Sequence, residues 1–421
     1  MSSRFFKQSF CVMIFMLFNY AWSQTPLDRA FIKAVEQDNI STIKALLASG
    51  ADINCKSGDK TIILLAIENC SIETIKFLVE SGAPINNIIR NQHTVWGSVT
   101  PVELSALLLR PAVFTYFLDK DPSFPRELSC YALIGMNNFL DFKFRGNSRE
   151  SDLNKVFYIL RKISERVSSQ TNPEWWFQDY SNYNYFDHNL DDYILKAPLS
   201  IAVGCYTYMS DRYDKQCRYH YPDTLIQYLI DHVQSINMTS AKKTPLMHAI
   251  ISGNTSAIRI ILSHPDIDLY IYDARMGRTA LMFALDMDCS ICEDIPLVSE
   301  WSKQFKSNLE WSYDDLVRLR AYIVRQILQS PHELPINNTD RSGNTALHYA
   351  ISHEFKPRQV WVDNDRFRKL CFDYKKEIIK SLLEKGADIN LKNKEGKSPL
   401  VLAVESVYFS EELQNILLNI K

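Results

Sequence analysis

The sequence predicts an all-α fold, a solenoid of repeated helix pairs, from two recurring patterns. One is a helix start in which Thr or Ser precedes small and apolar residues, as in Thr244–Ala249 (TPLMHA), Thr279–Ala284 (TALMFA), Thr345–Ala350 (TALHYA) and Ser398–Ala403 (SPLVLA). The other is a glycine followed by a turn-rich link, GADIN, at 50–54 and again at 386–390. A unit that recurs through 421 residues favours an array that grows by stacking, because a single core rarely reaches this length.

The best-preserved unit is Lys375–Ala403. Its apolar residues, such as Ile378 and Leu382, fall at helical spacing and predict an amphipathic helix that ends at Gly386. A turn-rich link follows, and Ser398 with the proline after it predicts the start of the next helix. This order resembles the ankyrin-repeat family, whose unit is about 33 residues long and carries a Thr-Pro-Leu-His-x-Ala signature. The resemblance implies helix pairs joined by short hairpin-like links.

We expect about nine such repeats, of which the first and the last act as caps. The fourth keeps helical patterns at 128–136 and 153–167 but lacks the signature. The other repeats begin at Asp28, Thr61, Thr100, Ala197, Thr244, Thr279, Thr345 and Ser398.

Three repeats exceed the length of the unit, and the extra residues lie between the first and the second helix of the pair. These insertions are near 204–222, 286–315 and 351–373. Because one slot of a stacked repeat recurs on one face, we expect them to lie side by side along one edge, opposite the hairpin tips. A fourth long segment, near 168–196, joins the fourth and fifth repeats and is too aromatic for a disordered linker.

The inserted segments are rich in Trp, Tyr and charged residues, which include the types enriched where proteins bind each other. They supply the candidate partner-binding residues, which are Trp175, Trp176, Tyr180, Tyr183, Tyr185, Trp301, Trp311 and Trp361. The alternative is that these aromatic side chains only cover the helices beneath them, since amphipathic side chains do both.

Residues 1–23 have the three parts of a signal peptide. Arg4 and Lys7 form a basic start, residues 10–18 form an apolar core, and Ala21 and Ser23 are small residues at the positions that a signal peptidase requires. The apolar core is well short of the roughly 20 residues that span a bilayer. We therefore expect cleavage after Ser23, a mature solenoid of residues 24–421 with no membrane span, and export to the periplasm or the medium.

Eight cysteines remain after cleavage, an even number in a chain expected in an oxidising compartment. The candidate disulfides are Cys205–Cys217 and Cys289–Cys292. The second pair has the spacing of a thiol oxidoreductase, but no βαβ pattern and no second metal-binding pair accompany it. Cys70 lies in or beside a predicted helix, where buried free thiols are common.

No phosphate-binding loop, dinucleotide fingerprint or nucleophile motif occurs in the sequence, and the formal net charge is −2. We therefore expect no nucleic-acid partner, no cofactor and no catalytic or metal site. The resemblance implies that His248 and His348 hydrogen-bond within and between neighbouring repeats.

Repeats that bury their faces against each other leave a concave groove and the hairpin tips for partners, with no side chain set up for catalysis. We therefore expect a monomeric, non-enzymatic scaffold that binds a protein. Two alternatives stay open: an exported bacterial effector that binds a host protein, and a thiol redox protein that uses Cys289 and Cys292.

Overall fold

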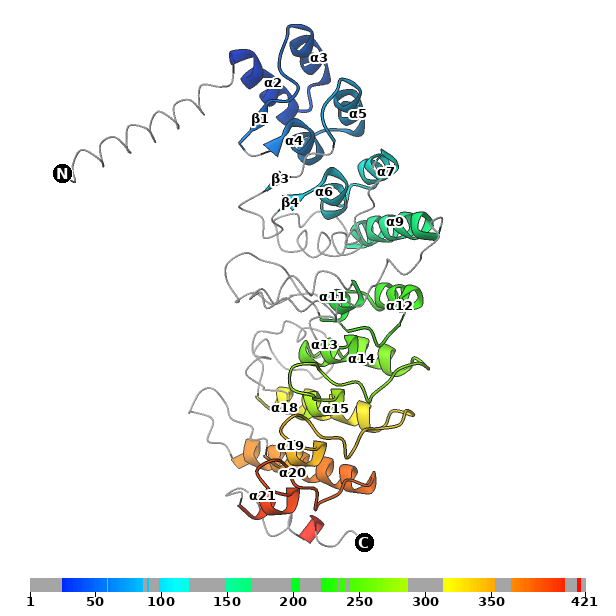
Figure 1. Cartoon of the computed structure of the whole chain (residues 1–421), viewed down its shortest axis with the longest axis vertical. Coiled ribbons are helices and arrows are strands. Elements are labelled where there is room, and N and C mark those ends of the chain that lie inside the picture. Colours follow the sequence, from blue (N-terminus) through cyan, green and yellow to red (C-terminus); the bar gives the residue numbers. More distant parts are fainter. Residues whose placement is uncertain are drawn as a thin grey trace, which may run out of the picture. The chain divides into compact units, whose positions relative to one another are not determined.

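The computed structural model describes residues 25–58, 60–85, 89–90, 98–120, 149–168, 198–204, 221–233, 235–239, 243–286, 313–352, 365–405 and 415–417. The chain divides into two compact units, and each is described by itself. Unit 1 holds the described residues up to Ile163, and unit 2 holds those from Ser164 onward. Figure 1 labels the elements of both.

Unit 1 is built from antiparallel helix pairs, in which we name the first helix inner and the second outer. The inner helices are α2 (Pro26–Glu36), α4 (Ile62–Asn69) and α6 (Pro101–Leu107), and the outer helices are α3 (Ile40–Ala48), α5 (Ile72–Glu80) and α7 (Pro111–Lys120). α2 packs on α4 and α4 on α6, while each inner helix also packs on its own outer helix. α9 (Arg149–Ser168) coincides with the second helix expected for the fourth repeat.

Two inner helices of unit 1, α2 and α6, begin with a capping box. The Thr25 hydroxyl accepts the backbone N–H of Asp28 (3.1 Å), and the Asp28 carboxylate accepts the N–H of Thr25 (3.0 Å). Thr100 and Glu103 form the same box at the start of α6. Each box satisfies backbone donors that the first turn of a helix leaves unpaired.

Short antiparallel hairpins link the repeats of unit 1. β1 (Lys56–Ser57) pairs with β2 (Lys60–Thr61), and Lys56 lies opposite Thr61. β3 (Ile89–Arg90) pairs with β4 (Ser98–Val99), and Ile89 lies opposite Val99. The hairpin-like links that the sequence predicts are therefore two-residue ladders.

Unit 2 is likewise built from pairs of inner and outer helices. Its inner helices are α11 (Pro198–Gly204), α13 (Pro245–Ile251), α15 (Ala280–Leu285), α19 (Ala346–Ser352) and α21 (Pro399–Glu405), and its outer helices are α12 (Asp223–His232), α14 (Thr255–Leu262), α18 (Tyr313–Leu328) and α20 (Asp365–Glu384). Successive inner helices pack on one another from α11 through α21, and successive outer helices do so from α12 through α20. The core is one layer between the two stacks, with Leu246, Ile261, Ile323 and Ile379 almost fully buried.

The outer helices of the seventh and eighth repeats are longer than expected. The insertions were expected to reach residues 315 and 373, but α18 begins at Tyr313 and α20 at Asp365. The end of each insertion is thus an added N-terminal extension of the outer helix. The guanidinium of Arg320 lies 5.9 Å from the ring centre of Tyr374, so α18 and α20 contact each other near these extensions.

Two asparagines tie neighbouring loops of unit 2 together, and we call each contact a loop clamp. The amide oxygen of Asn337 accepts the N–H of Asp388 (2.9 Å), and its nitrogen donates to the carbonyl of Gly386 (2.9 Å). Asn237 makes the same pair of bonds to the N–H of Asp268 (2.9 Å) and the carbonyl of Asp266 (2.7 Å). Each clamp holds the loop after one outer helix against the loop of the next repeat.

Among the described residues, no helix is both long enough and apolar enough to cross a membrane.

Candidate functional site: the hairpin edge of unit 2

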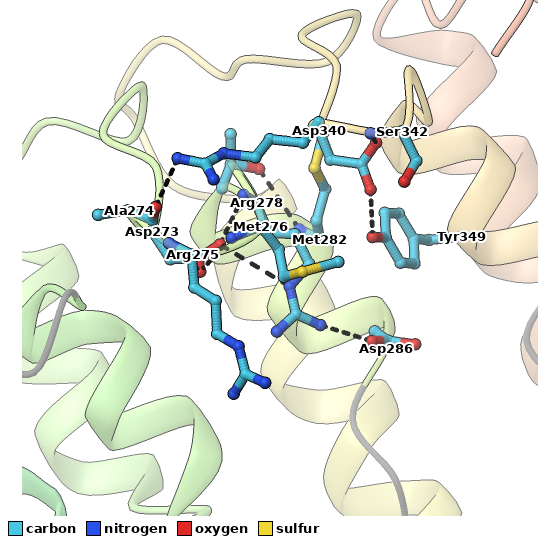
Figure 2. Close-up of polar contacts among 12 residues, drawn as sticks. Asp273, Ala274, Arg275, Met276, Arg278, Met282, Asp286, Asp340, Ser342 and Tyr349 are labelled. Atoms are coloured by element: carbon cyan, nitrogen blue, oxygen red, sulfur yellow. Dashed lines mark hydrogen bonds and ion pairs between the residues drawn. The ribbon is translucent and has the colours of Figure 1, made fainter. Parts of the chain in front are cut away.

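Three hairpins of unit 2 share one internal design. In the first, the Asp273 carboxylate accepts the backbone N–H groups of Met276 (2.9 Å) and Arg278 (2.7 Å), as Figure 2 shows. In the second and third, Asp340 accepts from Ser342 and Asn344, and Asn393 accepts from Glu395 and Lys397, at 2.7–3.0 Å. A carboxylate or amide oxygen thus replaces water as the partner of two turn N–H groups in every loop.

The same three hairpins are joined by backbone hydrogen bonds, which we call the hairpin ladder. The N–H of Arg341 donates to the carbonyl of Met276 (2.8 Å), and the N–H of Lys394 donates to the carbonyl of Ser342 (2.9 Å). Gly343 has a φ of 80°, and a Cβ added to it would lie 2.9 Å from the nitrogen of Lys394. Glycine at this position therefore permits both the turn and the close approach of the next loop.

Beneath the ladder, His348 bonds within its own repeat and to the next one. Its Nδ1 lies 3.1 Å from the backbone nitrogen of Thr345, which donates to it, and its Nε2 lies 3.1 Å from the carbonyl of Lys397. The imidazole is buried, and this burial lowers the pKa of His348, so the neutral ring is the favoured form.

Family models of ankyrin repeats match the chain in three stretches. A model of three ankyrin-repeat copies matches residues 8–120 and 216–295, and a single-repeat model matches 342–394. Together these stretches cover more than half of the sequence. The chain belongs to the ankyrin-repeat family.

Among solved structures, the chain is similar to the crystal structure of EF0377, an ankyrin repeat protein. The two are 20% identical, and the match covers 62% of this chain and 92% of that one with a TM-score of 0.35. No curated protein matches the sequence.

The structure corrects one detail of the ankyrin signature. The bonding expected of both histidines requires the His position of the signature, but only His348 stands there, three residues after Thr345, whereas His248 stands four residues after Thr244. Met247 occupies the signature position in that repeat and is fully buried. The bonding expected for both histidines is therefore confirmed at His348, while at His248 the register differs by one residue.

The exposed hairpin residues of unit 2 include several large apolar side chains. Tyr270, Tyr272 and Met276 are 38%, 64% and 38% exposed, and all three belong to the loop between α14 and α15. Elsewhere in the described residues, the large apolar side chains with comparable exposure are Tyr158, Val401 and Val404. We use "hairpin edge" for the exposed residues of the loops 269–278, 338–344 and 391–397.

Ion pairs follow one register along the inner helices of this ankyrin array. A basic residue directly before the helix cap pairs with an acidic residue eight positions later, in Lys60–Glu68 (2.7 Å), Arg278–Asp286 (2.6 Å) and Lys397–Glu405 (2.6 Å). The hydrogen bond that Lys397 donates to the Glu405 carboxylate raises the pKa of Lys397. In these three repeats, the basic residue before the cap is therefore neutralised by a carboxylate at the end of its own inner helix.

Next to one of these pairs, the hydroxyl of Tyr349 donates to the buried carboxylate of Asp340 (2.7 Å), as Figure 2 shows. Burial, together with this carboxylate, raises the pKa of Tyr349. A phenol that stays protonated and bound to the hairpin carboxylate fixes the loop to its own inner helix.

Two of the three described cysteines, Cys55 and Cys70, are buried thiols, whereas Cys371 is only partly buried. Cys55 and Cys70 are buried and free, and burial raises the pKa of each to about 12. A thiol with such a pKa holds almost no thiolate at neutral pH and is a poor nucleophile. The buried free thiol predicted at Cys70 is confirmed. Within the described residues, no group of three or more His, Cys, Asp or Glu side chains could hold a metal ion.

The site residues predicted from sequence lie outside the described residues. This holds for the eight aromatic candidates, and it holds for both candidate disulfides, Cys205–Cys217 and Cys289–Cys292. They stay predictions. The hairpin edge was named only in general terms, as the hairpin tips, because sequence alone did not tell which tip residues are exposed. The signal that could have found it is the cluster of Tyr270, Tyr272 and Met276 within one short link, where the other links carry polar residues.

Proposed function

We propose that this protein is an exported scaffold that binds a protein partner, and that the hairpin edge of unit 2 is a contact surface for that partner. Ankyrin repeats generally mediate protein–protein interaction, which supports the first part. The observation that carries the second is the exposure of Tyr270, Tyr272 and Met276 on one rigid hairpin.

Exposed Tyr and Met on a fixed loop suit a binding surface for a physical reason. Both side chains bury a large apolar area on contact, and Tyr and Met are enriched in protein interfaces. The hairpin ladder and the Asp273 carboxylate already hold the loop in place, so little conformational entropy is lost when a partner binds.

The export part of the proposal rests on residues 1–23. The first described helix supports a mature start close to Gln24, because the capping box of α2 begins at Thr25 and needs no residue of the leader. An exported effector would use the same fold to bind a protein inside the host. Whether the partner comes from the host or from the exporting cell distinguishes this alternative from a periplasmic or secreted scaffold.

The double variant Tyr272→Ser and Met276→Ser tests the binding surface. We expect it to lower the affinity for a partner that co-purifies with the mature chain by about tenfold or more, because it removes two apolar contacts. Affinity is measured by calorimetry with the purified partner, and far-UV circular dichroism checks that the fold is kept. The matched control is Tyr158→Ser, which removes an exposed Tyr (42%) from unit 1. Equal affinities of the wild type and the double variant would rule out the hairpin edge as the contact surface.

A further inference from the structure

Each hairpin of unit 2 presents one exposed basic side chain at the same point of its loop. Arg275, Arg341 and Lys394 are all exposed, and each stands two residues before its hairpin glycine. The N–H groups of Arg341 and Lys394 are also the donors of the hairpin ladder. Hydrogen bonds between successive loops therefore set the spacing of this basic row.

The charges of the basic row are not neutralised by the part of the chain that the structure describes. There, neither Arg275 nor Lys394 has an ion pair or a side-chain hydrogen bond, and Figure 2 shows the Arg275 side chain extending away from the contacts of Asp273. Arg341 donates to the carbonyl of Ala274 (2.7 Å), a group without net charge. The basic residues at the inner helices differ, because Arg278 and Lys397 are paired with carboxylates.

Acidic groups near the row either face inward or are scattered. Asp273 and Asp340 are buried behind the tips, and their oxygens accept backbone N–H groups. Glu395 is exposed within one of these loops, and Asp268 and Asp388 are exposed just before two of them. A closely spaced polyanion such as nucleic acid would contact the basic row but would also be repelled by these exposed carboxylates. A protein segment whose own carboxylates are spaced apart can contact the basic row without lying next to the exposed carboxylates.

We propose that the hairpin edge takes an extended acidic protein segment, whose carboxylates lie on the basic row and whose apolar anchor lies against Tyr272 and Met276. The proposal rests on the proposed function and adds the chemistry of the partner. Each exposed ion pair contributes little affinity by itself, so the row acts through specificity and association rate, and the anchor supplies most of the binding.

The test uses the mature chain and a random copolymer of glutamate and tyrosine as the probe. We expect binding that weakens as salt is raised, and a loss of about tenfold in affinity in the triple variant Arg275→Gln, Arg341→Gln and Lys394→Gln. The matched control changes Arg318, Lys369 and Lys385 to Gln, which removes the same charge from exposed positions outside the hairpin edge. This control should bind the copolymer as the wild type does.

Three results would overturn the proposal. They are the absence of copolymer binding, equal losses in both triple variants, and equally tight, row-dependent binding of single-stranded poly(dT) or phosphatidylserine vesicles. The proposed function is tested independently, since it requires that the double variant Tyr272→Ser and Met276→Ser bind the co-purified partner more weakly than the wild type does. If the Tyr272→Ser, Met276→Ser variant loses the partner but the basic-row variant still binds it, the hairpin edge is the contact surface. The proposal that this surface prefers an acidic segment is then wrong.

Discussion

At the scale of single residues, the positions that matter most are those where a loop must come close to its neighbour. Gly343 and Gly396 occupy the same place in successive hairpins, with φ of 80° and 78°. They differ in their surroundings, because an added Cβ would contact the backbone of Asn393 and Lys394 at Gly343 and nothing within 4 Å at Gly396. A substitution at Gly396 therefore measures only the free-energy cost of the left-handed backbone conformation, whereas one at Gly343 also includes the cost of crowding the next loop.

Alanine at both positions should separate these costs. We expect Gly396→Ala to lower the free energy of unfolding by about 1 kcal/mol through its left-handed backbone. Gly343→Ala should cost about 1 kcal/mol more, because the next loop must move. Urea unfolding gives the two energies, and hydrogen exchange at the Lys394 amide should be faster only in Gly343→Ala. Equal energies and unchanged exchange would show that the loops are not held by the ladder.

At the scale of elements, the repeats are connected by polar side chains as well as by the apolar core. Asn337 and its neighbour Asn338 are both exposed, but among the described residues only the Asn337 side chain forms hydrogen bonds, two of them, to the loop after α20. The two asparagines are adjacent and of the same type, so a comparison between them isolates the clamp.

We expect Asn337→Ala to lower the free energy of unfolding by about 1 kcal/mol, the usual net worth of such hydrogen bonds. Asn338→Ala should change it by a few tenths at most, since surface substitutions away from such contacts have small effects. Chemical unfolding followed by circular dichroism measures both. A clamp that contributes nothing would give two variants of equal stability.

The helix pairs could be predicted from sequence because their signals are local. A Thr or Ser cap followed by small and apolar residues placed α13, α15, α19 and α21 at their observed starts. The early starts of α18 and α20 could not be predicted, because their first turns have mixed composition and are helical only as extensions of packed outer helices. The hairpin edge could not be predicted from sequence either, since the exposure of its residues and the hairpin ladder depend on contacts between loops some 50 to 70 residues apart.

At the scale of the whole molecule, the proposed export makes a prediction about the mature chain. Expressed with its leader in a bacterial host, the exported protein should have the intact mass of residues 24–421. Its thermal stability should equal that of a chain produced without the leader, because the capping box of α2 begins at Thr25.

The control for export replaces Ile14 and Leu17 by Asp within the apolar core, which should keep the chain in the cytoplasm. A chain that retains residues 1–23, or that is exported equally well with both substitutions, would contradict a cleavable leader.

The hairpin ladder has a direction, and this bears on how such a protein can change its length. In both bonds, the later loop donates an N–H to the carbonyl of the earlier loop. If the middle repeat, which carries Arg341 and Ser342, were deleted as a whole, the N–H of Lys394 would lie opposite the carbonyl of Met276. The junction would then again pair a backbone N–H with a backbone carbonyl. Gain or loss of complete repeats therefore preserves the hydrogen bonds at the junction, whereas a deletion of part of a repeat does not. Evolution or engineering can thus add and remove hairpin loops as modules.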